Sequence, residues 1–381
     1  MYQQVKLDEL CVHKIETISS DENGLIDYFD IASVDNTKKK IISHQSLKIE
    51  EAPSRAKQIV QLNDILVSTV RPNLNAVTII DNETKNKMVA STGFCVLRAS
   101  EKLEPRYLFY FVQSPTFINS MTAQATGASY PAVSNSIVKS SHIPLPDLPT
   151  QRRIADTLDK VSEGIEVCRK MLGELDLMVK AKFREMLETD YSEKTATEVC
   201  TAIVDCPHST PTYSGCELLY PAIRTSEISN GKINWNSMKY VSADEYRMRV
   251  KKLMPQPGDI VYAREGTYGD CVILPAGFSF CLGQRTMLFR PNIDIVNPIY
   301  LHQVLRSNYV KRQADKSNTG STVPHVNVAD AKQFHFPLPP IEVQNRFADF
   351  STKINESKLT IRGILDKMET EKLALMQGYF G

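Results

Sequence analysis

The most regular alternation of apolar and polar positions in this chain begins near residue 151. Apolar side chains recur there at steps of four and three residues, at Ile154, Leu158, Val161, Ile165, Cys168, Leu172, Leu175 and Val179. A heptad seam sustained over nearly four repeats predicts a long helix over residues 151–187 that packs against another helix. Pro146 and Pro149 should exclude helix upstream, and Thr150 is the expected N-cap.

Residues 341–380 predict a second long helix after Pro339-Pro340. Its apolar stripe is looser, because Ser351, Lys358 and Lys372 fall where the first helix has apolar residues. Each amphipathic helix needs an apolar partner and each starts where a globular segment ends, so we expect an intramolecular antiparallel coiled coil. The seam residues predicted for this helix pair are Ile154, Leu158, Val161, Ile165, Leu172, Leu175, Val179, Phe347, Ile354, Ile361, Leu365 and Met368.

Two glycines lie inside the first predicted helix. Gly164 and Gly173 should each cost about 1 kcal/mol relative to alanine. Either a neighbouring helix approaches closely at these positions, or the glycines are simply tolerated, and the sequence leaves both explanations open.

The segments that precede the two helices carry short β-rich runs separated by turn residues. In the first segment we expect strands at 65–70, 76–80 and 94–97, followed by a helix at 105–119. The second segment predicts strands at 260–263, 271–274 and 287–289 and a helix at 298–312. Both segments are therefore predicted to be mixed α and β structure.

The two halves of the chain repeat one plan. Pro144-Leu145-Pro146 leads into Gln151-Arg152-Arg153-Ile154-Ala155-Asp156, and 193 positions later Pro337-Leu338-Pro339 leads into Gln344-Asn345-Arg346-Phe347-Ala348-Asp349. The same offset relates residues 126–133 to residues 319–326. Self-similarity at one fixed, long offset indicates a duplicated domain.

The expected fold class is α+β, with two similar mixed α/β domains joined by two long helices in a pseudo-twofold internal duplication. The predicted boundaries are residues 1–147 for the first domain, 148–190 for the central helix, 191–340 for the second domain and 341–381 for the C-terminal helix. We find no run of 18 apolar residues and no apolar signal segment, so the expected location is cytoplasmic.

Composition and motifs favour a protein without catalytic chemistry of its own. The sequence lacks the glycine-rich phosphate loops, the Gly-x-Ser-x-Gly nucleophile motif and the His-Glu-x-x-His metal motif. Cys200, Cys206, His208 and Cys216 lie close in sequence, but their spacing is unlike that of a zinc finger, so no metal site is expected. A net charge of +1 argues against indiscriminate binding of polyanions and leaves selective DNA binding open.

These features together resemble a known family. Gly320-Ser321-Thr322-Val323-Pro324-His325-Val326-Asn327, then Pro337-Leu338-Pro339-Pro340, Gln344 and Arg346, then a long helix ending in Gln377-Gly378-Tyr379-Phe380-Gly381, are similar to the specificity (S) subunit of type I restriction-modification enzymes. The resemblance covers both copies. The first copy departs from it at Asp147-Leu148-Pro149-Thr150 and at Ala128-Ser129-Tyr130-Pro131.

The resemblance implies a non-catalytic DNA-binding subunit. Each domain would be a target recognition domain that reads one half of an asymmetric bipartite target, and the helices would set the gap and dock two modification (methyltransferase) subunits. The other implied partners are double-stranded DNA and the restriction (translocating endonuclease) subunits. No cofactor is expected on this chain, because S-adenosylmethionine, ATP and magnesium would be bound by the partner subunits.

Candidate DNA-contacting residues are chosen among basic and polar side chains in expected loops, because these side chains contact phosphates and base edges. In the first domain we select Lys38, Lys39, Lys40, Arg55, Arg71, Ser129 and Tyr130. In the second domain we select Arg224, Arg249, Lys251, Arg264, Thr322 and His325. For each of them the alternative is a solvated side chain or a local structural contact.

Two other functions compete with this interpretation. The chain could be the specificity subunit of a related type II system, which neighbouring partner genes would distinguish. It could also be a scaffold whose twin domains bind proteins, which the near-neutral net charge permits.

Overall fold

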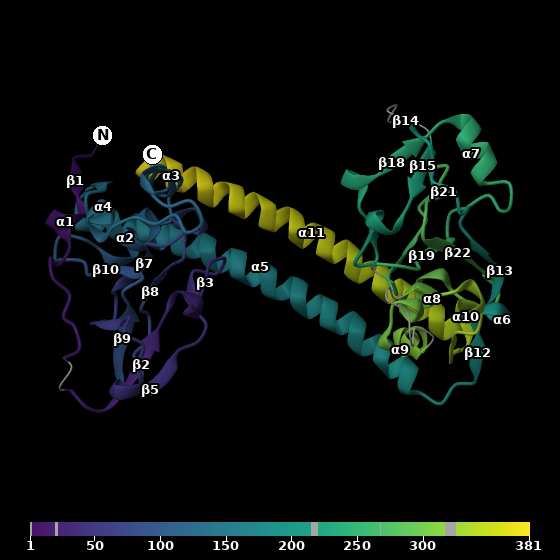
Figure 1. Ribbon diagram of the computed structural model, residues 1–381, viewed down its shortest axis with the longest axis horizontal. Coiled ribbons are helices and arrows are strands. Elements are labelled where there is room, and N and C mark those ends of the chain that lie inside the picture. Colours follow the sequence, from purple (N-terminus) through teal and green to yellow (C-terminus); the bar gives the residue numbers. More distant parts are fainter. Residues whose placement is uncertain (1, 20–21, 215–219, 267, 317–324) are drawn as a thin grey trace. The chain divides into compact units, whose positions relative to one another are not determined.

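A computed structural model describes residues 2–19, 22–214, 220–266, 268–316 and 325–381. The chain divides into two compact units, Met1–Leu172 with Thr360–Gly381, and Gly173–Leu359. Both chain ends belong to the first unit, where Figure 1 shows them beside β1 and α3. Each unit therefore combines one globular domain with parts of both long helices.

The first unit contains two main sheets. An antiparallel sheet has the order β10-β7-β8, and a mixed sheet has the order β5-β2-β9-β6 with β2 and β9 parallel. Its elements are β1 (Gln4–Lys6), α1 (Leu7–Leu10), β2 (Leu25–Phe29), β3 (Val34–Asp35), β4 (Lys40–Ile41), β5 (Gln45–Lys48), β6 (Ala56–Ile59), β7 (Ile65–Ser68), β8 (Val77–Ile79), β9 (Lys87–Ser91), β10 (Phe94–Leu97), α2 (Pro105–Phe111), α3 (Pro115–Gln124), α4 (Asn135–Lys139) and β11 (His142–Pro144).

The second unit repeats this layout. Its antiparallel sheet has the order β13-β22-β19-β20, and its mixed sheet has the order β14-β18-β15-β21 with β15 and β21 parallel. Its elements are β12 (Glu193–Thr195), α6 (Ala196–Val199), β13 (Cys200–Asp205), β14 (Tyr213–Ser214), β15 (Tyr220–Ile223), β16 (Ile228–Ser229), β17 (Lys232–Ile233), β18 (Lys239–Val241), α7 (Ala243–Arg249), β19 (Ile260–Ala263), β20 (Cys271–Ile273), β21 (Cys281–Leu282), β22 (Thr286–Pro291), α8 (Pro298–Leu305), α9 (Asn308–Lys316), α10 (Val328–Lys332) and β23 (His335–Pro337).

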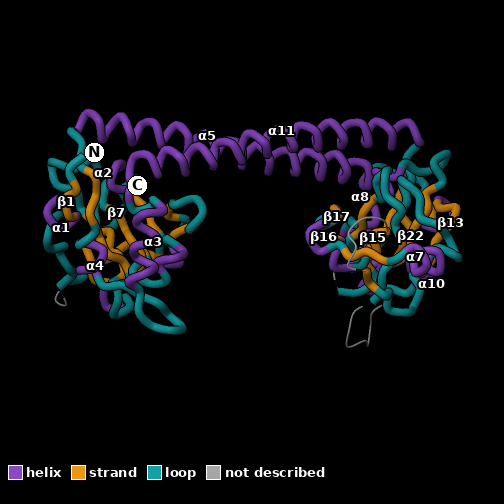
Figure 2. Tube along the Cα trace, turned by 90° about the horizontal axis from the view of Figure 1, so that it is seen from above, coloured by secondary structure: helices purple, strands orange, loops and turns teal. Residues whose placement is uncertain are grey.

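The two long helices are α5 (Leu148–Glu188) and α11 (Ile341–Phe380). In the first unit, Ile154 near the start of α5 shares a buried cluster with Phe380 at the end of α11. In the second unit, Phe183 near the end of α5 packs against Phe347 near the start of α11. Within each unit the helix segments are therefore antiparallel, and the strands lie to one side of them (Figure 2). The predicted fold class is confirmed.

The residues of the predicted seam are all buried or half-buried. Ile154, Leu158, Ile165, Phe347 and Ile354 are buried. The others are half-buried, namely Val161, Leu172, Leu175, Val179, Ile361, Leu365 and Met368. One polar interruption is accommodated by ion pairing, because the buried stem of Lys358 carries its ammonium to the carboxylate of Asp176.

The two helical glycines have different explanations. A Cβ atom on Gly164 would lie 2.1 Å from the Cε atom of Met368, so the end of this α11 side chain occupies the space that the glycine leaves. A Cβ atom on Gly173 would meet no atom within 4 Å, so this glycine is tolerated.

The start of α5 corrects one expectation. The helix already includes Pro149, and the Asp147 carboxylate accepts a hydrogen bond from the backbone N–H of Thr150 at 3.1 Å. Asp147 therefore caps the helix in place of Thr150. Proline is compatible with the first turn, where its missing N–H has no intrahelical acceptor to lose.

The single helices predicted at 105–119 and 298–312 are also wrong, because each is two helices. In the first copy α2 ends at Phe111 and α3 starts at Pro115, where the N-cap Ser114 accepts from the backbone N–H of Phe117 at 3.2 Å. In the second copy α8 ends at Leu305 and α9 starts at Asn308. The apolar spacing continues through both breaks, so periodicity alone did not reveal them.

Candidate nucleic-acid interface

Each long helix is anchored to its own domain by one buried glutamine. In the first unit the Gln151 side chain accepts from the backbone N–H of Glu104 at 2.8 Å and donates to the carbonyl of Pro146 at 2.8 Å. In the second unit the Gln344 side chain accepts from Asn297 at 2.9 Å and donates to Pro339 at 2.8 Å. The repeated Pro-Leu-Pro and glutamine motif is therefore one hydrogen-bond network built twice.

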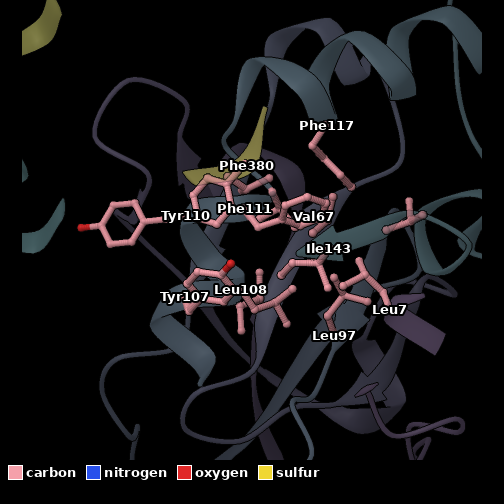
Figure 3. Close-up of a cluster of buried hydrophobic side chains, with 14 of the residues drawn as sticks. Leu7, Val67, Leu97, Tyr107, Leu108, Tyr110, Phe111, Phe117, Ile143 and Phe380 are labelled. Atoms are coloured by element: carbon pink, nitrogen blue, oxygen red, sulfur yellow. The ribbon is translucent and has the colours of Figure 1, made fainter. Parts of the chain in front are cut away.

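A second repeated contact fixes the far end of each helix. The Tyr107 hydroxyl donates to the carbonyl of Pro144 at 2.7 Å, and its ring lies 5.1 Å from that of Phe380 (Figure 3). In the other unit the Tyr300 hydroxyl donates to Pro337 at 2.6 Å, and its ring lies 6.0 Å from Phe183. Each domain thus holds the start of one helix and the end of the other.

The first unit presents a stacked arginine and tyrosine on two neighbouring loops. The guanidinium carbon of Arg71 lies 4.9 Å from the ring centre of Tyr130, which is 70 % exposed. The loops are joined by a hydrogen bond of 2.7 Å from the Arg71 backbone N–H to the carbonyl of Pro131. An exposed guanidinium held against an aromatic face can contact phosphate or guanine at little entropic cost.

The backbone beside this pair is strained. Arg71 and Asn75 both adopt left-handed conformations, with φ of 49° and 46°, on either side of the 3₁₀ turn Pro72–Leu74. Such conformations cost about 1–3 kcal/mol each in residues other than glycine and persist only when their surroundings enforce them. Asn75 is held by its side-chain hydrogen bond to the carbonyl of Val112 at 2.8 Å.

The structure separates the remaining candidates of the first unit. Ser129 lies with Tyr130 on the exposed loop, and Arg55 is exposed on a different edge, beside Thr92. Lys38 is exposed, whereas Lys40 pairs with Glu166 of α5 at 2.7 Å. Lys39 donates to the side chain of Asn75 at 3.0 Å. Lys39 and Lys40 thus hold the β3–β4 hairpin to the rest of the unit.

In the second unit, the selected arginines are largely committed to partners within the chain. Arg249 is 5 % exposed and donates to Glu245 and to the carbonyls of Leu282 and Ser209. Arg264 pairs with Asp205 and donates to Val326 at 2.8 Å. These intramolecular partners favour a structural role for both arginines.

Three other candidates of the second unit differ in their accessibility. Arg224 pairs with the buried Glu227, and its guanidinium carbon lies 5.3 Å from the ring centre of Tyr213. Lys251 is exposed. His325 is half-buried, and its backbone forms an isolated antiparallel β-bridge with Glu265. Thr322 lies outside the described residues.

Sequence reasoning missed two exposed groups of the second unit. Arg285, in a left-handed turn with φ of 63°, lies beside Glu265 at 3.0 Å and accepts a backbone hydrogen bond from Arg264. Lys239 lies 4.8 Å from the ring centre of Tyr213. The turn residues Gly283-Gln284 were a local signal for Arg285, whereas only pairing between distant strands places Tyr213 beside Lys239.

Two further properties concern the described part of the chain. No group of three or more His, Cys, Asp or Glu side chains within it is arranged to hold a metal ion. None of its helices has an apolar stretch that could cross a membrane.

Comparisons with known proteins agree with this architecture. The specificity subunit of the type I restriction enzyme MjaVIII from Methanocaldococcus jannaschii is 22 % identical over 340 residues, which cover 84 % of this chain and 78 % of that protein. A chain from a structure titled for complex assembly and conformational transition of the type I R-M system superposes with a TM-score of 0.64 at 23 % identity, over 100 % of this chain and 97 % of that one.

The S subunit of a type I restriction-modification system from M. genitalium superposes with a TM-score of 0.62 at 13 % identity, over 100 % of this chain and 96 % of that one. These structural likenesses show the fold. The family model described as the type I restriction modification DNA specificity domain matches residues 1–176 and 220–370. The scaffold and type II alternatives are not favoured, and the chain belongs to the family of type I restriction-modification DNA specificity subunits.

Proposed function

We propose that the two domains read different halves of one asymmetric, interrupted DNA target. The observation that carries this proposal is the contrast between the repeated anchors and the unlike exposed residues. Both units use the same glutamine and tyrosine contacts to hold their helices. Their exposed basic groups differ, with Arg71 stacked on Tyr130 in one unit and Arg285 and Lys239 in the other. A shared scaffold with different loops reads different base sequences.

The helices would supply the spacer and the docking surface for two modification subunits. Each unit exposes apolar side chains on its helix segments. In the first unit they are Val167, Met171, Ile364 and Leu373, and in the second Leu177, Met178 and Leu359. Exposed apolar side chains on a polar helix are characteristic of surfaces that a partner covers. Val167→Asp with Met171→Asp should therefore reduce the number of bound modification subunits, as measured by native mass spectrometry, whereas Lys170→Ala should not.

The chain itself would be non-catalytic. Methylation would use S-adenosylmethionine on the modification subunits, and translocation and cleavage would use ATP and magnesium on the restriction subunits. Because these partners and their DNA occupy the cytoplasm in the proposed role, we place the protein there.

Methylome sequencing tests this proposal directly. A host that expresses this chain with its modification subunit should gain one methylated motif of two unlike halves around a fixed gap, relative to the same host without this chain. A methylated motif of two identical halves would contradict the assignment of one half to each domain. Absence of any new motif from an assembled complex supplied with S-adenosylmethionine would contradict the function.

A further inference from the structure

A cavity of about 700 Å³ lies within the first unit, between the β3–β4 hairpin, α2 and the two long helices. Six cationic side chains and four carboxylates line it. Two of the carboxylates are already neutralised, because Glu166 pairs with Lys40 at 2.7 Å and Asp159 pairs with Arg106 at 2.6 Å. Lys40 is used by Glu166 and Arg169 pairs with Glu369 at 2.6 Å, so four of the cations face the two remaining carboxylates and the cavity keeps an excess of positive charge.

Among these cations, Lys39 and Lys372 are half-buried, whereas the other four are exposed. Within the described residues, neither ammonium lies at ion-pair distance from a carboxylate. Lys39 donates only to the backbone and side-chain oxygens of Asn75, and Lys372 lies 5.4 Å from the ring centre of Tyr110. Burial and then repulsion from Lys372 lower the pKa of Lys39 to about 8, and burial and then Arg169 lower the pKa of Lys372. Charges held in this way are stabilised by a bound anion.

In the second unit the charge at the corresponding place is neutralised by an ion pair within the chain. The strand registers match Lys39 with Gly231 and Ala76 with Asp270, and the duplication matches Gln113 with Arg306. Arg306 pairs with Asp270 at 2.6 Å and packs so closely that a Cβ atom on Gly231 would lie 2.5 Å from it. In the first unit Ala76 replaces the carboxylate of Asp270, and Gln113 replaces Arg306. Lys39 replaces Gly231.

We propose that this cavity is a binding site for a multivalent oxyanion of the phosphate class, held between Lys39 and Lys372. Its volume lies in the range of small-molecule sites. Ammonium groups at converging positions bind such anions through charge-assisted hydrogen bonds. The half-buried ring of Phe109, next to the buried Tyr110, lines the same cavity, so a nucleotide could place its base against Phe109 while its phosphates meet the lysines.

Isothermal titration calorimetry on the full chain tests the site, with inorganic pyrophosphate as the probe. Lys39→Gly, which copies the second unit at a position with φ of 56°, and Lys372→Met should each weaken binding about tenfold. Lys372→Arg, which keeps the charge, should retain binding, and Lys252→Ala on the other unit should have no effect. Thermal melts show that each variant is folded before it is titrated.

Parallel titrations with inorganic phosphate and with a nucleoside triphosphate distinguish the sources of the anion. Tighter binding of the nucleotide than of pyrophosphate would show that the base contacts the aromatic lining of the cavity. Equal binding would show that only the phosphates are recognised. Absence of pyrophosphate binding at millimolar concentration would overturn the proposal. Unchanged affinity in the folded Lys39→Gly and Lys372→Met variants would overturn it too.

Discussion

The two units of this chain share the contacts that hold their helices and differ in the groups around them. Gln151 and Gln344 make corresponding hydrogen bonds within 0.1 Å of one another in length. Near these anchors, however, the first unit has Phe109 and a cationic cavity where the second has His302 and the pair Arg306–Asp270. The duplicated fold thus retains the interactions that position the helices, while the groups around these anchors differ between the units.

The largest effect is expected at the aromatic anchors. Phe380→Ala should destabilise the first unit and Phe183→Ala the second, each by about 3–5 kcal/mol, because both rings are buried against a tyrosine. Hydrogen exchange should rise in α2 for the first variant and in α8 for the second. Leu373→Ala and Leu177→Ala, at exposed helix positions, provide the controls. Equal loss of protection in both units from either substitution would contradict their independent anchoring.

A smaller effect should distinguish the units at acid pH. Burial, with a contribution from Arg306, lowers the pKa of His302 to about 4. Because the unfolded chain binds this proton near pH 6.5 and the folded chain does not, stability of the second unit should fall as pH decreases from about 6.5 to 4, by roughly 3 kcal/mol. His302→Phe, which copies Phe109, should remove this dependence in pH-dependent denaturant melts.

The matching control is His142→Phe, at an exposed position of the first unit. It should leave the pH dependence of unfolding as it is. The same acid-induced loss in the His302→Phe variant as in the unmodified chain would show that another group is responsible.

Loss of the glutamine anchors should affect the two units alike. Gln151→Leu leaves the backbone N–H of Glu104 without its acceptor, and Gln344→Leu does the same to Asn297. Each should cost about 1–3 kcal/mol in unfolding free energy. Urea melts measure this cost, with Arg153→Ala as an exposed control on the same helix. A large cost in one unit and none in the other would show that the repeated network is not equivalent.

The smallest effect on stability is expected at Arg71. Arg71→Ala removes an exposed side chain, so the melting temperature should change little, while affinity of the assembled complex for its target should fall by about 1–3 kcal/mol. Arg264→Ala should instead lower stability, because it leaves the Asp205 carboxylate and the Val326 carbonyl without this partner. Fluorescence anisotropy and thermal melts separate the outcomes, and unchanged affinity in the Arg71 variant would remove this residue from the proposed interface.

Periodic patterns predicted the elements that depend on spacing alone. The heptad positions of α5 and the repeat at an offset of 193 residues established the long helices, the duplication and the resemblance to the family. They could not show the breaks before Pro115 and Asn308, because an apolar stripe continues across a change of helix direction. They also assigned Thr150 as the cap, because Asp147 lies only three residues earlier and both residue types suit that position.

The roles of individual charged residues were decided by tertiary structure. Arg71 and Arg249 are the same residue type in segments expected to be loops, yet one is exposed on Tyr130 and the other is buried among carbonyls. The excess charge at Lys39 and Lys372 arises because a hairpin and a helix more than 300 positions apart in sequence line one cavity. The sequence by itself determined the repeated scaffold, because the spacing of apolar and motif residues is visible along the chain. Burial and charge neutralisation depend on which distant side chains meet, and only the folded chain decides that.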